Sequence, residues 1–394
     1  IDAGSEYEGS SGETQWYGSG TQNITLSGTA SFYNLNAQYG TKNIIGNLDV
    51  NAIFYIFSST IVQDGAPGQV HTFRGTVRLD GTANFTNKVI LKSPTGASIY
   101  HNTTGSTITF GPADIDVEGY TWVGSSDTNQ TTLHCQGNLN ILSHYLVIRF
   151  GSNLTGTSSK SFIQQTNTNL YVRGTDNYPS GFGTYTHEYG SYVRYDWNAD
   201  QTIRGGITYP HLVIDIAEAA ATYTKTISGN IVVNGNLYVR PQADSAQLNL
   251  HIGNNNVELR GNLEDSYDPN QVRKVVINQS GGTFTLNGID NNQYFYRRDA
   301  SSQYSFNNFS IVNRAPTTER TKYFVGDDQT NPGNSTIDLT VLGDFTVVNE
   351  STNPANVVNI DLNNIRINGN SSGTFALGNN VRVLVGSNQF GTSV

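Results

Sequence analysis

Three carboxylates stand at alternate positions in one short segment, at Asp114, Asp116 and Glu118. In a strand, alternate residues point to the same face, so these side chains would share one surface. Several oxygen ligands together suit Ca²⁺, and a pair of carboxylates suits the cleavage of a glycosidic bond. The other interpretation is a solvated row of acids, with Ile115 and Val117 turned inward. Calcium is the one cofactor that this pattern suggests.

Other arrangements that carry chemistry are missing from the sequence. Of the seven His, none has metal-ligand spacing with a second His or Cys except His134 beside Cys135, and adjacent strand residues face opposite ways. There is no G-x-S-x-G elbow, Walker phosphate loop or dinucleotide-binding motif. We therefore expect that the chain is not an enzyme. A polysaccharide lyase or hydrolase that uses Asp114 and Asp116 is the alternative.

The composition excludes two classes of partner. The net charge is −9 and only 13% of the residues are charged, whereas binding to nucleic acid needs clustered Lys and Arg. No apolar run approaches the ~20 residues of a membrane-spanning helix. We expect neither a nucleic-acid partner nor a membrane span. Many β-branched residues and 22 Tyr favour sheet, and helical patterns are nearly absent.

The single cysteine and the first residue bear on location. One Cys rules out an internal disulfide, and Cys135 shares a strand face with Leu133, which predicts a buried, inert thiol. An intermolecular disulfide is the alternative. The sequence starts at Ile1 rather than Met, so we expect a removed export signal and an extracellular or cell-surface location.

The clearest structural pattern runs from Ser228 to Leu263. Apolar residues alternate with polar ones in runs of three to five residues, which predicts short strands with one apolar face. Asn and Gly tolerate the backbone of tight turns, so Asn234-Gly235 predicts a corner. The residues expected to point inward are Val233, Leu237, Leu250, Ile252, Val257 and Leu259.

A diverged repeat extends this pattern along the chain. An opening strand such as Gly282-Thr-Phe-Thr-Leu-Asn-Gly288 is followed by an aromatic–aliphatic strand and a closing element, G-[N/D]-[L/F]-x-[V/I]. The closing element starts at Gly46, Gly137, Gly235 and Gly343. Recurrence at a fixed spacing of about 90 residues is typical of repeat architectures. Short strands with short corners favour an all-β fold, a β-solenoid, over the alternative of tandem β-sandwich domains.

The expected organisation follows from the repeat. Residues 1–11 are a loose polar arm, and residues 12–189 hold two repeats with insertions near 96–127 and 173–190. A third repeat spans 190–281 and a fourth spans 282–372. Residues 373–394 begin a further repeat and do not complete it.

The order of these motifs resembles that of large secreted, repetitive β-rich surface proteins of bacteria and archaea. The matching segments are the Gly282 strand, the aromatic strand from Phe306, the closing element at Gly343 and the strands from Val358 to Asn370. The resemblance covers most of residues 12–394, whereas 96–190 departs from it. It implies an extracellular adhesin, filament or sheath component with β-helical segments.

Two groups of residues are expected at the surface. Tyr and Trp suit interfaces and sugar stacking, and a Tyr-rich stretch lies at 177–197. The apolar segment at 373–394 would leave an open sheet end that can pair with another chain. Interface residues expected from these two stretches are Tyr185, Tyr189, Tyr192, Phe375, Leu377, Val383 and Val385. The alternatives are a loop packed on its own solenoid and a hairpin that covers its own end.

Ten Asn-X-Ser/Thr motifs permit glycosylation in an exported protein, although the abundance of Asn, Ser and Thr alone predicts about as many. They begin at Asn23, Asn84, Asn102, Asn129, Asn153, Asn278, Asn308, Asn334, Asn349 and Asn370.

These observations together favour an extracellular structural protein. We expect a self-assembling subunit of a surface filament, sheath or surface layer, with copies joined head-to-tail and with an adhesive role. The alternative functions are a polysaccharide-processing enzyme and a β-helical protein that binds surface carbohydrate without cleaving it.

Overall fold

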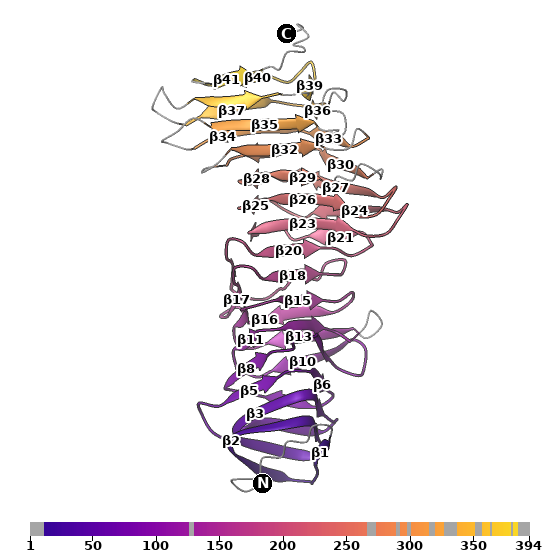
Figure 1. The fold of residues 1–394 in the computed structure, drawn as a ribbon, viewed down its shortest axis with the longest axis vertical. Coiled ribbons are helices and arrows are strands. Elements are labelled where there is room, and N and C mark those ends of the chain that lie inside the picture. Colours follow the sequence, from indigo (N-terminus) through magenta and orange to yellow (C-terminus); the bar gives the residue numbers. More distant parts are fainter. Residues whose placement is uncertain are drawn as a thin grey trace. The chain divides into compact units, whose positions relative to one another are not determined.

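The computed structural model describes residues 12–125, 130–265, 273–288, 292–297, 301–314, 320–326, 337–350, 357–362, 365–379 and 381–384. Over these residues the chain is all-β, has no helix and forms a β-solenoid of about 13 turns (Figure 1). The solenoid prediction is confirmed. The strands of the described turns pair in parallel, whereas the sandwich alternative would need antiparallel pairs. The expected arm at 1–11 lies outside the described residues.

Short strands stack on three faces in the first of two compact units, residues 1–191. Its first turns are β1 (Glu13–Trp16) and two long strands, β2 (Thr21–Ala37) and β3 (Gly40–Ile56). One face then holds β4 (Thr60–Asp64), β7 (Thr82–Asn84), β10 (Ser106–Phe110), β13 (Thr131–Cys135) and β16 (Asn153–Gly156). The second holds β5 (Val70–Phe73), β8 (Lys88–Leu91), β11 (Ile115–Val117), β14 (Leu139–Ile141), β17 (Ser161–Gln164) and β19 (Thr184–His187). The third holds β6 (Thr76–Leu79), β9 (Ala97–Tyr100), β12 (Tyr120–Val123), β15 (Tyr145–Ile148) and β18 (Asn169–Val172).

The second unit, residues 192–394, repeats the three-faced arrangement. One face holds β20 (Tyr192–Tyr195), β23 (His211–Ile216), β26 (Leu237–Pro241), β29 (Leu263–Asp265), β32 (Gln293–Arg297), β35 (Arg320–Gly326), β38 (Val358–Asp361) and β41 (Val381–Leu384). The next holds β21 (Gln201–Ile203), β24 (Thr222–Ile227), β27 (Gln247–Gly253), β30 (Lys274–Gln279), β33 (Gln303–Phe306), β36 (Ile337–Val341) and β39 (Ile365–Gly369). The last holds β22 (Thr208–Tyr209), β25 (Ile231–Val233), β28 (Val257–Leu259), β31 (Thr283–Leu286), β34 (Asn308–Asn313), β37 (Phe345–Asn349) and β40 (Phe375–Leu377).

The strand β3 shows how one turn is made. Its first part pairs with β4, its middle with β5 and its end with β6, so a single strand bends around all three faces. One turn takes 20 residues between Asn23 and Asn43 and 36 residues between Ser310 and Thr346. The solenoid accommodates this variation in its corners, because the stacked strands stay in register.

The core runs along the inside of the stack. Every residue that the alternation predicts to point inward between Val233 and Leu259 is fully buried. Asn234 and Gly235 form the corner between β25 and β26, as predicted. The described residues contain no helix, and hence none long and apolar enough to cross a membrane.

The closing element of the repeat has a physical explanation. In each copy the Asn or Asp oxygen accepts a backbone N–H from the following turn, and the next two alternate apolar residues point inward. The four bonds join Asn47 to Val70 (2.9 Å), Asn138 to Ser161 (2.9 Å), Asn236 to Asn262 (3.0 Å) and Asp344 to Thr374 (3.0 Å). The Gly is required because a Cβ at Gly137 would lie 1.9 Å from the carbonyl oxygen of Ala113 in the preceding turn.

The two stretches expected as insertions also contribute rungs. Residues 97–123 form β9 to β12, which pair with strands of the turns before and after them. Residues 184–187 form β19, which pairs with β17. The expected repeat boundaries themselves stay a prediction.

Candidate functional site

The carboxylates at Asp114, Asp116 and Glu118 flank and occupy β11, and each has a partner within the protein. Asp114 accepts the backbone N–H of Asn138 at 2.8 Å. Glu118 forms an ion pair of 2.8 Å with Lys92, on the turn below.

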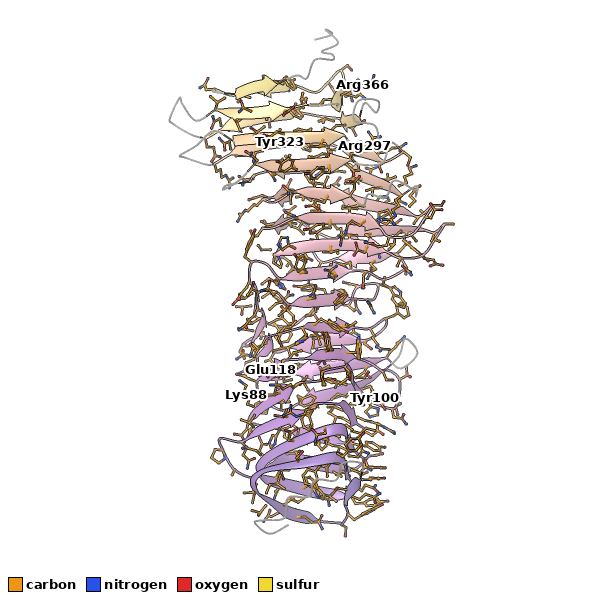
Figure 2. All side chains as sticks on the ribbon, viewed as in Figure 1. Lys88, Tyr100, Glu118, Arg297, Tyr323 and Arg366 are labelled. Atoms are coloured by element: carbon orange, nitrogen blue, oxygen red, sulfur yellow. The ribbon has the colours of Figure 1, made fainter. Side chains whose placement is uncertain are left out.

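Asp116 lies between these two and contacts Lys88 and the Asn140 amide, the latter at 2.8 Å. It is 2% exposed, so a solvated row is wrong for its middle member. Lys88 and Glu118 lie on the same side of the first unit (Figure 2). A calcium ion here would have to displace both lysines, because their ammonium groups already neutralise the two carboxylates. The described residues contain no group of three or more His, Cys, Asp and Glu that could hold a metal.

A buried His–Asp pair lies between β4 and β5 and was not predicted from the sequence. His71 on β5 contacts Asp64 at the end of β4, with 2.5 Å between Nε2 and Oδ1. Asp64 also accepts the backbone N–H of Asn87 at 2.7 Å, and these hydrogen bonds hold its pKa below the ordinary value although burial acts to raise it. Both side chains are sealed, at 0% and 2% exposure, so the pair cannot reach a substrate. No sequence signal reveals it, because the two residues meet only across a corner.

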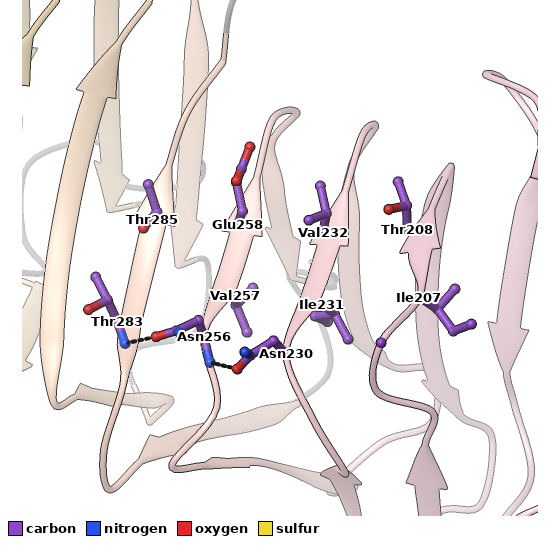
Figure 3. A pocket seen from close by; sticks show the side chains of 11 residues that line it. Ile207, Thr208, Asn230, Ile231, Val232, Asn256, Val257, Glu258, Thr283 and Thr285 are labelled. Atoms are coloured by element: carbon purple, nitrogen blue, oxygen red, sulfur yellow. Dashed lines mark hydrogen bonds between the residues drawn. The ribbon is translucent and has the colours of Figure 1, made fainter.

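A shallow groove crosses β22, β25, β28 and β31 on the outer face of the second unit (Figure 3). Thr208, Val232, Glu258 and Thr285 line it in successive turns. Its one carboxylate, Glu258, contacts Arg260 at 2.9 Å and the Asn287 amide at 2.9 Å. The groove therefore presents no second acid or base with which Glu258 could share general acid–base catalysis.

Aromatic side chains gather on the outer face of β12, β15 and β18. The rings of Tyr120 and Tyr145 lie 4.6 Å apart between centroids, and those of Tyr145 and Tyr171 lie 5.4 Å apart. Trp122 lies against the bare backbone of Gly96, where a Cβ would be 1.9 Å from the indole. We call Tyr120, Trp122, Tyr145 and Tyr171 the aromatic face.

Two arginines lie over the aromatic face. The guanidinium of Arg149 is 5.4 Å from the centroid of Trp122, and that of Arg173 is 5.3 Å from the centroid of Tyr171. All four rings are half-buried, so their remaining surface faces solvent. This face was not predicted from the sequence. Its signal was the recurrence of Tyr at 120, 145 and 171, which matches the length of one turn.

The residues expected at an interface fall into separate places. Tyr185 is half-buried and packs on Phe162, with centroids 6.2 Å apart, whereas Tyr189 is 72% exposed. Tyr192 belongs to the second unit and stacks on His211 at 4.7 Å. The Tyr-rich stretch is therefore not one continuous patch within either unit.

The other expected interface residues that the structure describes lie together on the last described turn. Phe375 and Leu377 on β40 are 54% and 45% exposed, and Val383 on β41 is half-buried. Val385 lies outside the described residues. Among the described strands, β39, β40 and β41 pair only with the turn before them.

The glycosylation motifs lie mostly at exposed positions. Asn308 and Asn349 are half-buried, and their side-chain oxygens accept hydrogen bonds from Asp344 and Asn313. Asn129 and Asn334 lie outside the described residues. The exposed members are Asn23, Asn84, Asn102, Asn153, Asn278 and Asn370.

The thiol of Cys135 is fully buried, and burial raises its pKa to about 12. This confirms the expected buried thiol. A thiol that stays protonated is a poor nucleophile and a poor metal ligand.

Comparison with protein-family models, with curated proteins and with solved structures returned no match.

Proposed function

We propose that the chain is an extracellular structural protein, a self-assembling subunit of a cell-surface filament, sheath or surface layer. The observation that carries this proposal is the last described turn. Phe375 and Leu377 stand in register with the buried Phe345 and Val347 of the turn before, yet they are 54% and 45% exposed. An exposed strand edge templates the addition of another strand, and among the described strands β39, β40 and β41 pair on one side alone.

The proposed occupant of this edge is the first turn of a second copy. Successive turns of the described solenoid pair in one direction, so the outer edge of β39, β40 and β41 is complementary to the outer edge of β1 and β2. Such a contact is heterologous, and a heterologous contact that does not close generates a fibre. Adhesion to a surface is part of the same proposal.

The test is the assembly state of the full chain. The double substitution Phe375→Asp and Leu377→Asp places two charges on the proposed contact and should leave single particles in negative-stain micrographs. Val348→Asp is the matched control, since Val348 is 42% exposed on the preceding strand of the same face and lies outside the contact. Fibres formed equally by the double variant and the control would place the contact elsewhere.

Carbohydrate binding is a second candidate, and the aromatic face favours it. Aromatic rings stack on the apolar faces of sugars, and strands spaced about 4.8 Å apart repeat these rings at close to the length of one sugar unit. Retention on insoluble polysaccharides should fall in Trp122→Ala and Tyr145→Ala. The control is Tyr17→Ala, which removes an exposed ring at 54% exposure.

An enzyme that cleaves polysaccharides is the rival to both. Turnover that disappears in Asp114→Asn or Asp116→Asn would favour it. We expect no turnover, because Asp116 is buried against Lys88.

A further inference from the structure

Three lysines are fully buried, at 0% exposure: Lys42, Lys225 and Lys322. The whole chain has seven lysines. Lysine is almost never fully buried unless it is paired, because removing an ammonium ion from water is very costly. Burial of the same residue type at three separate turns calls for a common chemical explanation.

Each of these lysines faces a glutamine of the preceding turn. The strand register pairs Gln22 with Lys42, Gln201 with Lys225 and Gln293 with Lys322. In every case the lysine Nζ contacts the glutamine Oε1, and in the third pair this distance is 2.9 Å. Since Oε1 is bonded to Cδ, each amine stands beside a carboxamide carbon.

The pair of Gln201 and Lys225 has the most complete surroundings. Lys225 donates to the carbonyl oxygens of Trp197 and Ala199, at 2.6 and 2.9 Å, which fixes Nζ in place. The backbone N–H of Trp197 donates to Oε1 of Gln201 at 3.2 Å. Burial lowers the pKa of Lys225 to about 7, so a large share of the amine is neutral and nucleophilic at neutral pH.

The pair of Gln293 and Lys322 repeats this geometry. The backbone N–H of Gly288 donates to Oε1 of Gln293 at 3.0 Å, and Lys322 donates to the Gly288 carbonyl at 3.1 Å. A backbone N–H aimed at a carbonyl oxygen stabilises the negative charge that develops there when a nucleophile adds to the carbon. Two pairs in different turns therefore hold both a positioned amine and an oxyanion donor.

We propose that these lysines condense with the glutamines they face, forming isopeptide bonds between successive turns. The Nζ–Cδ bond forms and the Cδ–Nε2 bond breaks. A proton passes from Nζ to Nε2, which leaves as ammonia, so atoms and charge balance without an oxidant or a co-reactant. The product is a neutral secondary amide.

The amide accounts for the burial of the lysines. It removes the charge that makes a buried ammonium costly and keeps an N–H to donate to the nearby carbonyls. It also links neighbouring turns covalently in a chain whose one cysteine cannot form an internal disulfide. This inference is independent of the proposed assembly, because all three links are within one chain.

The chain contains its own control pair. Gln247 and Lys274 are paired in the same strand register, but both are half-buried and Gln247 donates instead to Asn249 at 2.8 Å. In this pair the glutamine amide bonds within its own strand and the lysine is not sealed from water, unlike the three buried pairs. This pair is expected to stay unlinked.

The decisive measurement is mass spectrometry of the folded, full-length protein. We expect the intact mass to fall below the sequence mass by one ammonia for each of the three pairs. Digestion should yield a peptide that joins the segments around Gln201 and Lys225, with no cleavage by trypsin after Lys225. Recovery of the Lys225 peptide with a free amine, in place of the joined peptide, would overturn the proposal.

Single substitutions separate this reaction from other losses of ammonia. Lys225→Met keeps the length of the apolar stem and removes the amine. The mass deficit of this variant, measured against its own sequence mass, should therefore be smaller than that of the parent by one ammonia. Lys274→Met should leave the deficit unchanged. If Lys225→Met does not fold, Gln201→Met removes the other partner and gives the same readout. Equal deficits in the parent and in these Lys225 or Gln201 variants would contradict the assignment.

Discussion

Phe345 stacks on Phe309, one turn below it, with ring centroids 5.7 Å apart and ring planes within 5° of parallel. The relationship extends in both directions along the same face. Phe309 stacks on Phe284 at 5.6 Å, and Phe375 stacks on Phe345 at 5.2 Å. The strand register brings the four rings into one column. The first three are at most 3% exposed, so only Phe375 has a free face.

Truncation within this column should be costly. Phe309→Ala removes a fully buried ring and should lower the free energy of unfolding by about 3–5 kcal/mol, through lost transfer energy and a cavity. Phe375→Ala should cost far less, because its ring is already 54% exposed. Denaturant unfolding of both variants measures the difference. Equal losses would mean that the column does not stabilise the fold as a stack.

The inward assignment of β27 can be tested with a single charge. Leu250→Asp places an unpaired carboxylate at a position with 0% exposure and should cost about 4 kcal/mol or more. His251→Asp, on the next residue of the same strand, points outward and should change the midpoint only slightly. Thermal melts followed by circular dichroism compare the two. A Leu250→Asp variant that melts with the parent would exclude the assignment.

The sequence predicted the fold because its patterns are local. Alternation fixes which side chains of a short strand face the core, as it does at Val257 and Leu259, and Asn-Gly pairs mark corners such as Asn234-Gly235. The contacts at the candidate sites depend on which residues meet one turn apart. Turns vary from 18 residues between Thr29 and Asn47 to 38 residues between Arg320 and Val358, so no fixed spacing links Gln201 with Lys225. Asp64 and His71 meet across a corner whose path the sequence does not reveal. The burial of Asp116 also escaped prediction, because Lys88 covers it from another turn.

His187 should make the stability of the first unit depend on pH. Its Nδ1 donates to Oε1 of Gln164 at 2.7 Å and its Nε2 accepts from the hydroxyl of Tyr178 at 2.6 Å, an arrangement that fits the neutral ring. Burial lowers the pKa of His187 from 6.5 to about 4. Between these values the unfolded chain binds more protons than the folded one, so stability falls as the pH is lowered through this window.

The size of the effect can be isolated by substitution. Two to three pKa units correspond to about 3 kcal/mol between pH 7 and pH 4. His187→Gln removes the titrating group, so its stability should lose that part of the pH dependence, whereas the exposed His251→Gln should retain it. Denaturant unfolding at half-unit steps of pH gives the comparison. A profile of His187→Gln that parallels the parent from pH 7 to pH 4 would show that His187 is not the titrating group.

The corner at the closing element of the repeat should depend on a side-chain oxygen and not on its charge, because both Asn and Asp occupy this position. Oδ1 of Asn47 accepts the backbone N–H of Val70 at 2.9 Å, and Asp344 does the same for Thr374 at 3.0 Å in another copy. Asn47→Ala leaves the Val70 N–H without this acceptor and should cost about 1–3 kcal/mol. Asn47→Asp keeps the oxygen and should stay close to the parent. Hydrogen exchange at the Val70 amide gives a local readout, with faster exchange expected in the Ala variant alone. Similar protection of this amide in all three proteins would mean that the corner holds without the side chain.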